Sequence, residues 1–118
     1  MRLATWNINS VRLRVNLVVD FLKEADVDVL CLQETKTENM HFPQDALHEA
    51  GWHHQAIRGE KSYNGVAIIS RLPLHNKTHN NWAGRLDCRH ISAIIEGGLT
   101  VHNFYVPAGG DVPDRGEN

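Results

Sequence analysis

The first third of the sequence changes from strand-like to helix-like spacing and back, which constrains the fold more than any other feature. Residues 2–6 predict a short strand, and Ser10 can then cap a helix that runs to about Ala25. Residues 27–32 are too short for a buried helix and rich in β-branched and apolar side chains, so they predict a second strand. The apolar positions with helical spacing are Leu13, Leu17, Val18, Phe21 and Leu22.

The two strands that a crossover helix joins in one sheet are parallel, and the connection is nearly always right-handed. The two strands should therefore end at the same edge of the sheet. After them, Pro43 can open a second helix that reaches His48 or Glu49 and is ended by Gly51. Further strands are predicted at 52–57, 66–70, 90–96 and 99–106, the last two joined by a tight turn at Gly97-Gly98. The tract 71–89 predicts mainly loop, with room for an edge strand near Leu74.

Two of the predicted strands are continuously apolar, which is typical of strands covered on both faces. They contain Val29–Leu32 and Val66–Ile69. Because two helices can cover only one face, we expect a further layer from a partner or from sequence beyond Asn118. The polar tail 108–118 is rich in Gly and Pro and predicts a loop interrupted in its middle.

Composition places the 118-residue chain among globular proteins, with 42% hydrophobic and 22% charged residues. Its apolar runs fall far short of the ~18 to 20 residues that span a bilayer, and its start lacks a signal-peptide pattern, so we expect a cytoplasmic protein without a membrane partner. Cys31 and Cys88 lie far apart and are expected to be free thiols. A net charge of −2 provides no global basic field, so any contact with DNA requires a local patch.

Asn7 and Glu34 each follow one of the two parallel strands, at the edge where open α/β sheets bind ligands. They should converge. A carboxylate suits Mg²⁺, which takes only one or two carboxylates and keeps waters. The uncharged Asn7 could hydrogen-bond that carboxylate or a metal-bound water and hold it in place. The competing interpretation is that Glu34 is a helix cap or a surface charge.

Three weaker candidates remain. Tyr105 ends the last predicted strand, where its hydroxyl could donate to a phosphate oxygen, although an interior tyrosine is the commoner case. Arg12, near the amino end of the first helix, is a plausible phosphate contact or simply a solvated arginine. His75 and His79 have the spacing of a helical zinc pair, but the surrounding Pro and Asn residues disfavour a helix. No nucleotide-binding loop or nucleophilic-serine motif is present.

Four short motifs in a fixed order resemble the exonuclease III and abasic-site (AP) endonuclease family of the endonuclease/exonuclease/phosphatase superfamily. The resemblance extends from Met1 to about Asp114. It implies an α/β (α+β) fold, namely the amino-terminal half of a four-layer α/β sandwich of the DNase I-like kind, with a mixed sheet flanked by helices. Residues 1–118 would then be the first half of a single domain. The motifs are TWNINSVR at 5–12, LQETK at 32–36, YNGVA at 63–67 and NFYVP at 103–107.

The resemblance also assigns roles to individual residues. Glu34 matches the ligand of the divalent metal, and Asn7 matches the asparagine beside it, which belongs to the same metal site. Tyr105 matches a tyrosine that hydrogen-bonds the scissile phosphate, and these three residues form the expected catalytic set. Lys36 matches a lysine near the metal-site carboxylate and joins the DNA-binding set. The other positions that match contacts to the DNA backbone or groove are Arg12, Tyr63, Gly65 and Arg89.

The resemblance implies a hydrolase that uses Mg²⁺ or Mn²⁺ to cleave phosphodiesters at abasic sites and 3′ ends of duplex DNA. The sequence departs from the family in lacking the aspartate of its G-D-x-N motif, which activates water, and a histidine near its carboxyl end. We therefore expect this fragment to be inactive alone. The alternatives are another phosphodiesterase of the superfamily, acting on sphingomyelin or inositol phosphates, or a non-catalytic remnant.

Overall fold

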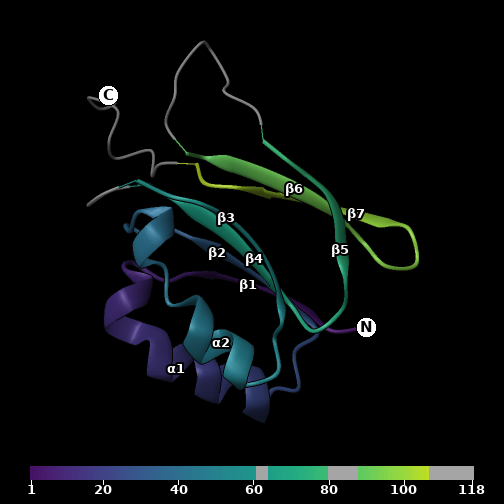
Figure 1. Cartoon of the computed structure of the whole chain (residues 1–118), viewed down its shortest axis with the longest axis horizontal. Coiled ribbons are helices and arrows are strands. Elements are labelled where there is room, and N and C mark those ends of the chain that lie inside the picture. The colour runs from purple at the N-terminus through teal and green to yellow at the C-terminus, as the bar shows by residue number, and fades with distance from the viewer. Residues whose placement is uncertain (61–63, 80–87, 107–118) are drawn as a thin grey trace, which may run out of the picture.

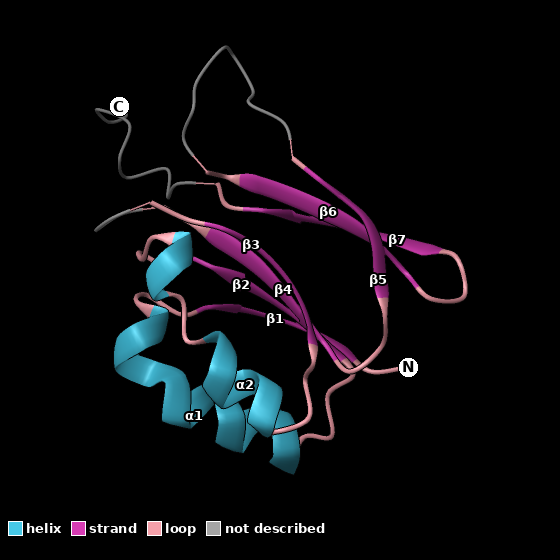
Figure 2. Cartoon of the chain, viewed as in Figure 1, coloured by secondary structure: helices cyan, strands magenta, loops and turns pink. Residues whose placement is uncertain are grey.

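The computed structural model describes residues 1–60, 64–79 and 88–106, which form three layers (Figures 1 and 2). Two helices cover one face of a four-stranded sheet, and a three-stranded sheet covers its other face. In chain order the elements are β1 (Leu3–Asn7), α1 (Val11–Glu24), β2 (Val29–Gln33), the 3₁₀ helix η1 (Asn39–His41), α2 (Gln44–Glu49), β3 (His54–Arg58), β4 (Val66–Ser70), β5 (Leu74–Thr78), β6 (His90–Ile95) and β7 (Leu99–Phe104).

The larger sheet has the strand order β1-β2-β4-β3. β1 and β2 are parallel, as the opening pattern predicts, with Asn7 opposite Gln33, whereas β2 and β3 are both antiparallel to β4. β1, β2 and β3 therefore end, and β4 begins, at one edge of this sheet. The mixed sheet with helices on one face agrees with the predicted α/β class.

The helix α1 begins where the sequence predicts, but the expected cap is wrong. Ser10 has a φ of 85° and makes no capping hydrogen bond through its side chain. Its backbone N–H instead donates to the carbonyl oxygen of Glu34 at 2.9 Å. The start of α1 is thus positioned by the turn after β2. In the part of the chain that the structure describes, no helix is long and apolar enough to cross a membrane.

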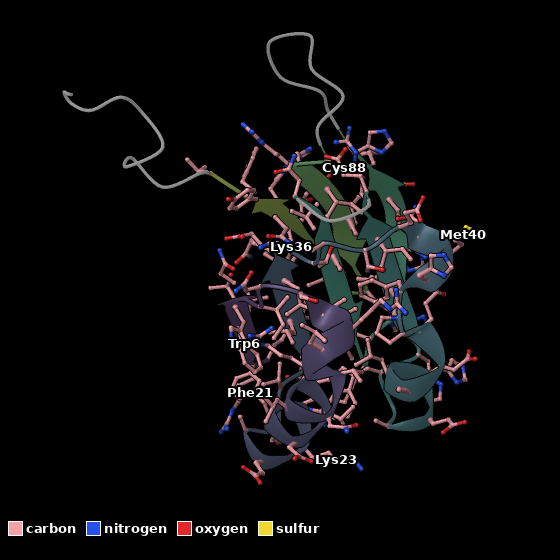
Figure 3. All side chains as sticks on the ribbon, turned by 90° about the vertical axis from the view of Figure 1, so that its left-hand side faces the viewer. Trp6, Phe21, Lys23, Lys36, Met40 and Cys88 are labelled. Atoms are coloured by element: carbon pink, nitrogen blue, oxygen red, sulfur yellow. The ribbon has the colours of Figure 1, made fainter. Side chains whose placement is uncertain are left out.

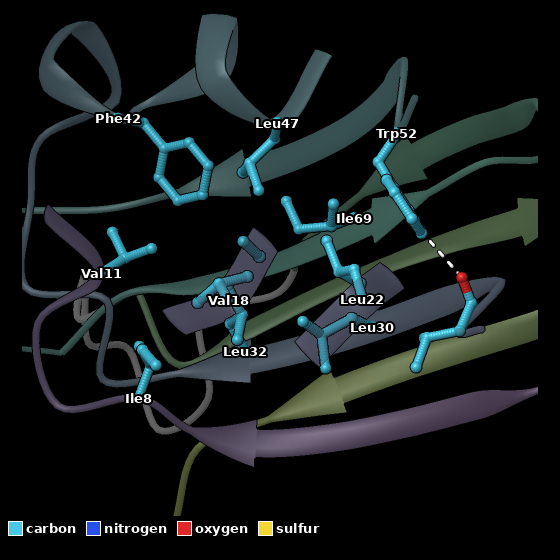
Figure 4. Close-up of a cluster of buried hydrophobic side chains, with 12 residues drawn as sticks. Ile8, Val11, Val18, Leu22, Leu30, Leu32, Phe42, Leu47, Trp52 and Ile69 are labelled. Atoms are coloured by element: carbon cyan, nitrogen blue, oxygen red, sulfur yellow. Dashed lines mark hydrogen bonds between the residues drawn. The ribbon is translucent and has the colours of Figure 1, made fainter. Parts of the chain in front are cut away.

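One hydrophobic core lies between the helices and the larger sheet (Figure 4). Val18 and Leu22 of α1 and Leu47 of α2 pack there onto the strand residues Leu30 and Ile69, all fully buried. The indole N–H of Trp52 donates to the carbonyl oxygen of Val27 at 2.9 Å, which satisfies a polar group inside this core (Figure 4).

A second core lies between the two sheets, and it corrects the expectation that the covering layer comes from outside the chain. Ile68 of β4 and Cys31 of β2 pack against Ile91 and Ile95 of β6 and Val101 of β7. The sheet β5-β6-β7 is antiparallel throughout and includes the edge strand expected near Leu74. The sequence correctly indicated two covered faces. It did not reveal that the later strands form a separate sheet that covers the second face.

A buried amide joins the two sheets close to the edge where β2 ends. The side-chain nitrogen of Asn103, a residue only 3% exposed, donates to the carbonyl oxygens of Leu32 and Ala67, both at 2.9 Å. Its side-chain oxygen accepts a 2.8 Å hydrogen bond from Gln33, which also donates to Thr5 at 2.8 Å. Both N–H donors and the carbonyl oxygen of the amide make hydrogen bonds, so the ends of β2 and β7 are held together.

We predict that Leu22→Ala lowers the free energy of unfolding by about 2 to 5 kcal/mol, because it leaves a cavity in the first core. Leu17→Ala makes the same change in the same helix at a side chain that is 57% exposed, and should alter stability by no more than about 0.5 kcal/mol. Urea denaturation of both variants measures the difference. Equal losses would contradict the assigned core.

Candidate functional site

The candidate site is the edge of the larger sheet where β1 and β2 end, together with the segments of the smaller sheet that Asn103 holds beside it. We call this region the rim and define it by its residues, which are 7–12, 33–36, 64–65, 88–89 and 105. Figure 3 shows Lys36 and Cys88 toward one end of the molecule, with Lys23 at the opposite end. Among the predicted site residues, direct side-chain contacts in the rim join Asn7, Glu34 and Lys36.

Asn7 and Glu34 converge in the rim, as the parallel strands predict. The side-chain amide of Asn7 donates to Oε2 of Glu34 at 2.6 Å. The second carboxylate oxygen, Oε1, faces the ammonium group of Lys36 at 3.6 Å. The exposed fractions of the Lys36 and Glu34 side chains are 31% and 22%, so the carboxylate is restrained by the protein yet open to solvent. This arrangement suits a carboxylate that binds an incoming cation.

The backbone of the turn after β2 is fastened on two sides. On one side, Ser10 and Val11 donate to the carbonyl oxygens of Glu34 and Thr35 at 2.9 and 3.1 Å. On the other side, the N–H groups of Thr35 and Lys36 donate to residues 65 and 64 at 3.2 and 2.9 Å. Four backbone hydrogen bonds therefore fix the direction in which the Glu34 side chain points.

Left-handed backbone conformations are concentrated in the rim. Among the described residues, eight other than glycine have positive φ, and six of them belong to the rim. Such conformations cost free energy in residues other than glycine and persist where the surrounding structure determines them, commonly at functional sites. The concentration of strain thus coincides with the candidate site. The six residues are Asn9, Ser10, Glu34, Lys36, Asn64 and Cys88.

Gly65 permits the closest approach of two segments in the rim. It has a φ of +96°, and a Cβ atom at this position would lie 2.1 Å from Oγ1 of Thr35, which is buried. Its N–H donates to the carbonyl oxygen of Cys88 at 3.1 Å. The residue assigned to DNA contact by resemblance therefore has a structural role, because it lets the turn after β2 pack against the start of β4.

The remaining predicted residues lie at different places in or near the rim. The N–H of Tyr105 donates to the carbonyl oxygen of Arg89 at 2.9 Å, which joins these two segments, and the half-buried Tyr105 side chain packs against the second core. Arg12 is exposed in the first turn of α1. Tyr63 lies outside the described residues.

Sequence reasoning missed Asn9, whose side-chain oxygen accepts a 2.6 Å hydrogen bond from the ammonium group of Lys36. It also missed Asn103 and the hydrogen bond from Asn64 to the Glu60 carboxylate at 2.9 Å. For Asn9 and Asn64 a signal was available, since asparagine is enriched at positive φ outside regular structure. For Asn103 the alternation of the strand indicates an inward direction, since it lies two residues after Val101, but its hydrogen-bond partners cannot be read from the sequence.

The donor chemistry of the rim fits a hydrated Mg²⁺ or Mn²⁺ ion. Glu34 offers one hard carboxylate oxygen that Asn7 does not use, and Mg²⁺ commonly binds proteins through one or two carboxylates while keeping several waters. No group of three or more His, Cys, Asp or Glu side chains suited to a metal occurs among the described residues, and His75 lies in the strand β5. Both thiols are free, and burial raises the pKa of Cys31 to about 11, so this thiol stays protonated at neutral pH.

The family model described as Endonuclease/Exonuclease/phosphatase family matches residues 4–117. The chain therefore belongs to this family, which confirms the resemblance. Among curated relatives, exodeoxyribonuclease III of Haemophilus influenzae is 31% identical over 117 residues, which cover 92% of this chain and 42% of that protein. The exodeoxyribonuclease of Bacillus subtilis is 34% identical over 76 residues, which cover 60% of this chain and 28% of that protein. The chain thus spans less than half the length of these relatives.

Solved structures agree with the fold. An AP endonuclease from Archaeoglobus fulgidus matches with a TM-score of 0.83 and 40% identity, covering 91% of this chain and 42% of that one. A 3′ phosphatase from Neisseria, bound to a product DNA hairpin, matches with a TM-score of 0.83 and 37% identity over 89% of this chain and 41% of that one. The chain has the fold of the corresponding part of these two proteins.

We predict that Gly65→Ala destabilises the chain more than Gly97→Ala does. Both substitutions force alanine into a positive φ, at a cost of about 1 to 3 kcal/mol. Gly97 has a φ of +105° and no atom within 4 Å of an added Cβ, whereas the Cβ at Gly65 would collide with Thr35 and add about 1 kcal/mol or more. Urea denaturation compares the two free energies of unfolding. Equal losses would show that the close approach at Gly65 does not constrain the rim.

Proposed function

We propose that this chain is the metal-ligand half of a DNA-repair nuclease of the exonuclease III type, which hydrolyses phosphodiesters at abasic sites and 3′ ends of duplex DNA. The observation that carries the proposal is the position of the Glu34 carboxylate. Asn7 donates to it at 2.6 Å, and backbone hydrogen bonds on two sides fix the turn to which it belongs. Tyr105 and Arg89 lie in the same rim. Family membership and relatives named as exonucleases and AP endonucleases support the choice of nucleic acid as substrate.

Glu34 would hold Mg²⁺ or Mn²⁺, and Asn7 would orient its carboxylate. When bound, the metal supplies polarisation of the scissile phosphate and stabilises the charge that develops on the leaving oxygen. The hydroxyl of Tyr105 would donate a hydrogen bond to the same phosphate. These three residues bind and orient, and none of them is placed to activate water.

Contact with the DNA backbone would come from a local basic patch, since the net charge of the chain is −2. Positive charge in the rim comes from Arg12, Lys36 and Arg89. Gly65 contributes by allowing the turn that contains Lys36 to pack closely against the segment before β4. Tyr63 is proposed as a further contact by its match to the family motif. The DNA hairpin bound to the related 3′ phosphatase supports duplex DNA with a 3′ end as the partner.

The residues that activate water would be contributed by a second half of the same domain. The chain covers 42% of its Haemophilus relative, and the family's aspartate of the G-D-x-N motif and its histidine have no counterpart in residues 1–118. A phosphodiesterase of the same superfamily that acts on sphingomyelin or inositol phosphates is the second candidate. The lysine of the LQETK motif, which contacts both Glu34 and Asn9, favours the nuclease.

The 118-residue chain alone should not nick abasic-site DNA at a measurable rate in Mg²⁺, because general acid–base catalysis contributes ~10²- to 10⁴-fold and its residues are absent. Fluorescence or gel assays of nicking, run beside a metal-free blank, test this expectation. Turnover that survives repurification and is abolished by Glu34→Gln would show that the base lies within this chain.

In a chain completed with a family-like second half, Glu34→Gln should depress the nicking rate strongly at ordinary Mg²⁺. The substitution keeps the shape of the side chain and removes the charge that holds a metal with few protein ligands. Raising the Mg²⁺ concentration should recover part of the rate. A variant that keeps the parent's rate and metal dependence would overturn the assignment of Glu34.

Tyr105→Phe in the same completed chain provides the contrast, since it removes one hydroxyl and leaves the metal ligand intact. A hydrogen bond to a charged group is worth about 1.5 to 3 kcal/mol, so the nicking rate should fall accordingly and should not recover with added metal. The measurement is the nicking rate as a function of Mg²⁺ concentration. A defect that vanishes at high Mg²⁺ would move Tyr105 from binding substrate to supporting the metal.

A further inference from the structure

The carboxylate proposed to bind metal already faces a cation of the protein itself. The ammonium group of Lys36 lies 3.6 Å from Oε1 of Glu34. Oε2 is occupied by the side-chain amide of Asn7. Oε1, the oxygen that accepts no hydrogen bond from Asn7 and is the more open to a metal, is therefore the one that the ammonium group approaches.

Asn9 anchors this ammonium group. Its side-chain oxygen accepts a hydrogen bond from Nζ of Lys36 at 2.6 Å, much shorter than the distance between Nζ and Glu34. Asn9 has a φ of 49°, and its carbonyl oxygen accepts a hydrogen bond from the guanidinium group of Arg14. Lys36 has a φ of 55°, and its N–H is held by the carbonyl oxygen of Asn64. Both partners are thus fixed at their backbones, and the lysine is kept beside the carboxylate without forming a close ion pair.

We propose that Lys36, positioned by Asn9, is a built-in counter-ion of Glu34 that competes with the divalent metal in the DNA-free protein. A divalent cation bound at Oε1 would be repelled by the ammonium group. The metal therefore binds only when the lysine is displaced, or it binds with lower affinity. Because Asn9 holds the lysine beside the carboxylate, the repulsion of the metal persists when no phosphate is present to attract the lysine. This inference rests on the proposed function, because it assumes that Glu34 binds the metal.

The test is direct measurement of Mn²⁺ binding to the DNA-free protein by electron paramagnetic resonance, with Glu34→Gln as the reference for binding elsewhere. Lys36→Met keeps the apolar stem and removes the charge. Lys36→Arg keeps the charge. Lys23→Met removes the same charge from the last turn of α1, at the opposite end of the molecule (Figure 3).

Lys36→Met should tighten Mn²⁺ binding roughly two- to tenfold, the range expected when a partly exposed charge beside a divalent site is removed. Lys36→Arg and Lys23→Met should bind as the parent does. The gain should shrink as ionic strength rises, because screening weakens the repulsion, whereas a purely structural effect of the substitution would not follow salt. Unchanged or weaker binding by Lys36→Met would overturn the proposal.

Asn9→Gly tests the anchor, since glycine accepts the positive φ and removes only the side chain. Mn²⁺ affinity should lie between that of the parent and that of Lys36→Met. In the Lys36→Met background the same substitution should change nothing, because Asn9 acts through the lysine. An equal effect in both backgrounds would contradict the positioning role.

The metal site at Glu34 and the counter-ion role of Lys36 can be tested separately. If the parent binds Mn²⁺ no better than Glu34→Gln does, both the metal assignment of the proposed function and the counter-ion are wrong. If the parent binds Mn²⁺ through Glu34 and Lys36→Met leaves the affinity unchanged, the metal assignment stands and the counter-ion alone is wrong.

Discussion

The buried amide of Asn103 joins two sheets that share an apolar core, which carries little directional information, and a hydrogen bond from Arg58 of β3 to the carbonyl oxygen of His90 in β6. It uses both side-chain hydrogens on carbonyl oxygens of β2 and β4 and accepts a hydrogen bond from Gln33, the residue before Glu34. A side chain that left these groups unsatisfied would cost about 1 to 3 kcal/mol for each buried partner. The position of β7, and with it Tyr105, relative to the candidate metal ligand depends on this network.

The rim can sustain its strained backbone because this frame surrounds it. The turn after β2, which contains the left-handed residues Glu34 and Lys36, accepts hydrogen bonds from Ser10 and Val11 on one side and donates hydrogen bonds to the segment before β4 on the other. The absence of a side chain at Gly65 allows the two turns to touch. Binding of a small, strongly hydrated cation by few protein groups requires those groups to be held in place beforehand, which the rim provides for Glu34.

The sequence predicted the parallel β1 and β2 and the convergence of Asn7 with Glu34, because both follow from hydrophobic spacing and the handedness of crossover connections. It did not reveal how the later strands divide into sheets, since the pairing of β5, β6 and β7 depends on contacts distant in sequence. The capping role expected of Ser10 was wrong for a related reason: its N–H is taken by the turn after β2. Asn9 and Asn103 escaped notice because their partners are set only by the folded arrangement.

The most direct test of the account is the location of a bound metal. Crystals of the protein grown with Mn²⁺ and examined by anomalous diffraction should show a peak within direct coordination distance of Oε1 of Glu34, with Asn7 still donating to Oε2. The Glu34→Gln variant should lack that peak under the same conditions. A peak elsewhere in the molecule, or one that persists unchanged in Glu34→Gln, would contradict the claim that the rim is a metal site built around this carboxylate.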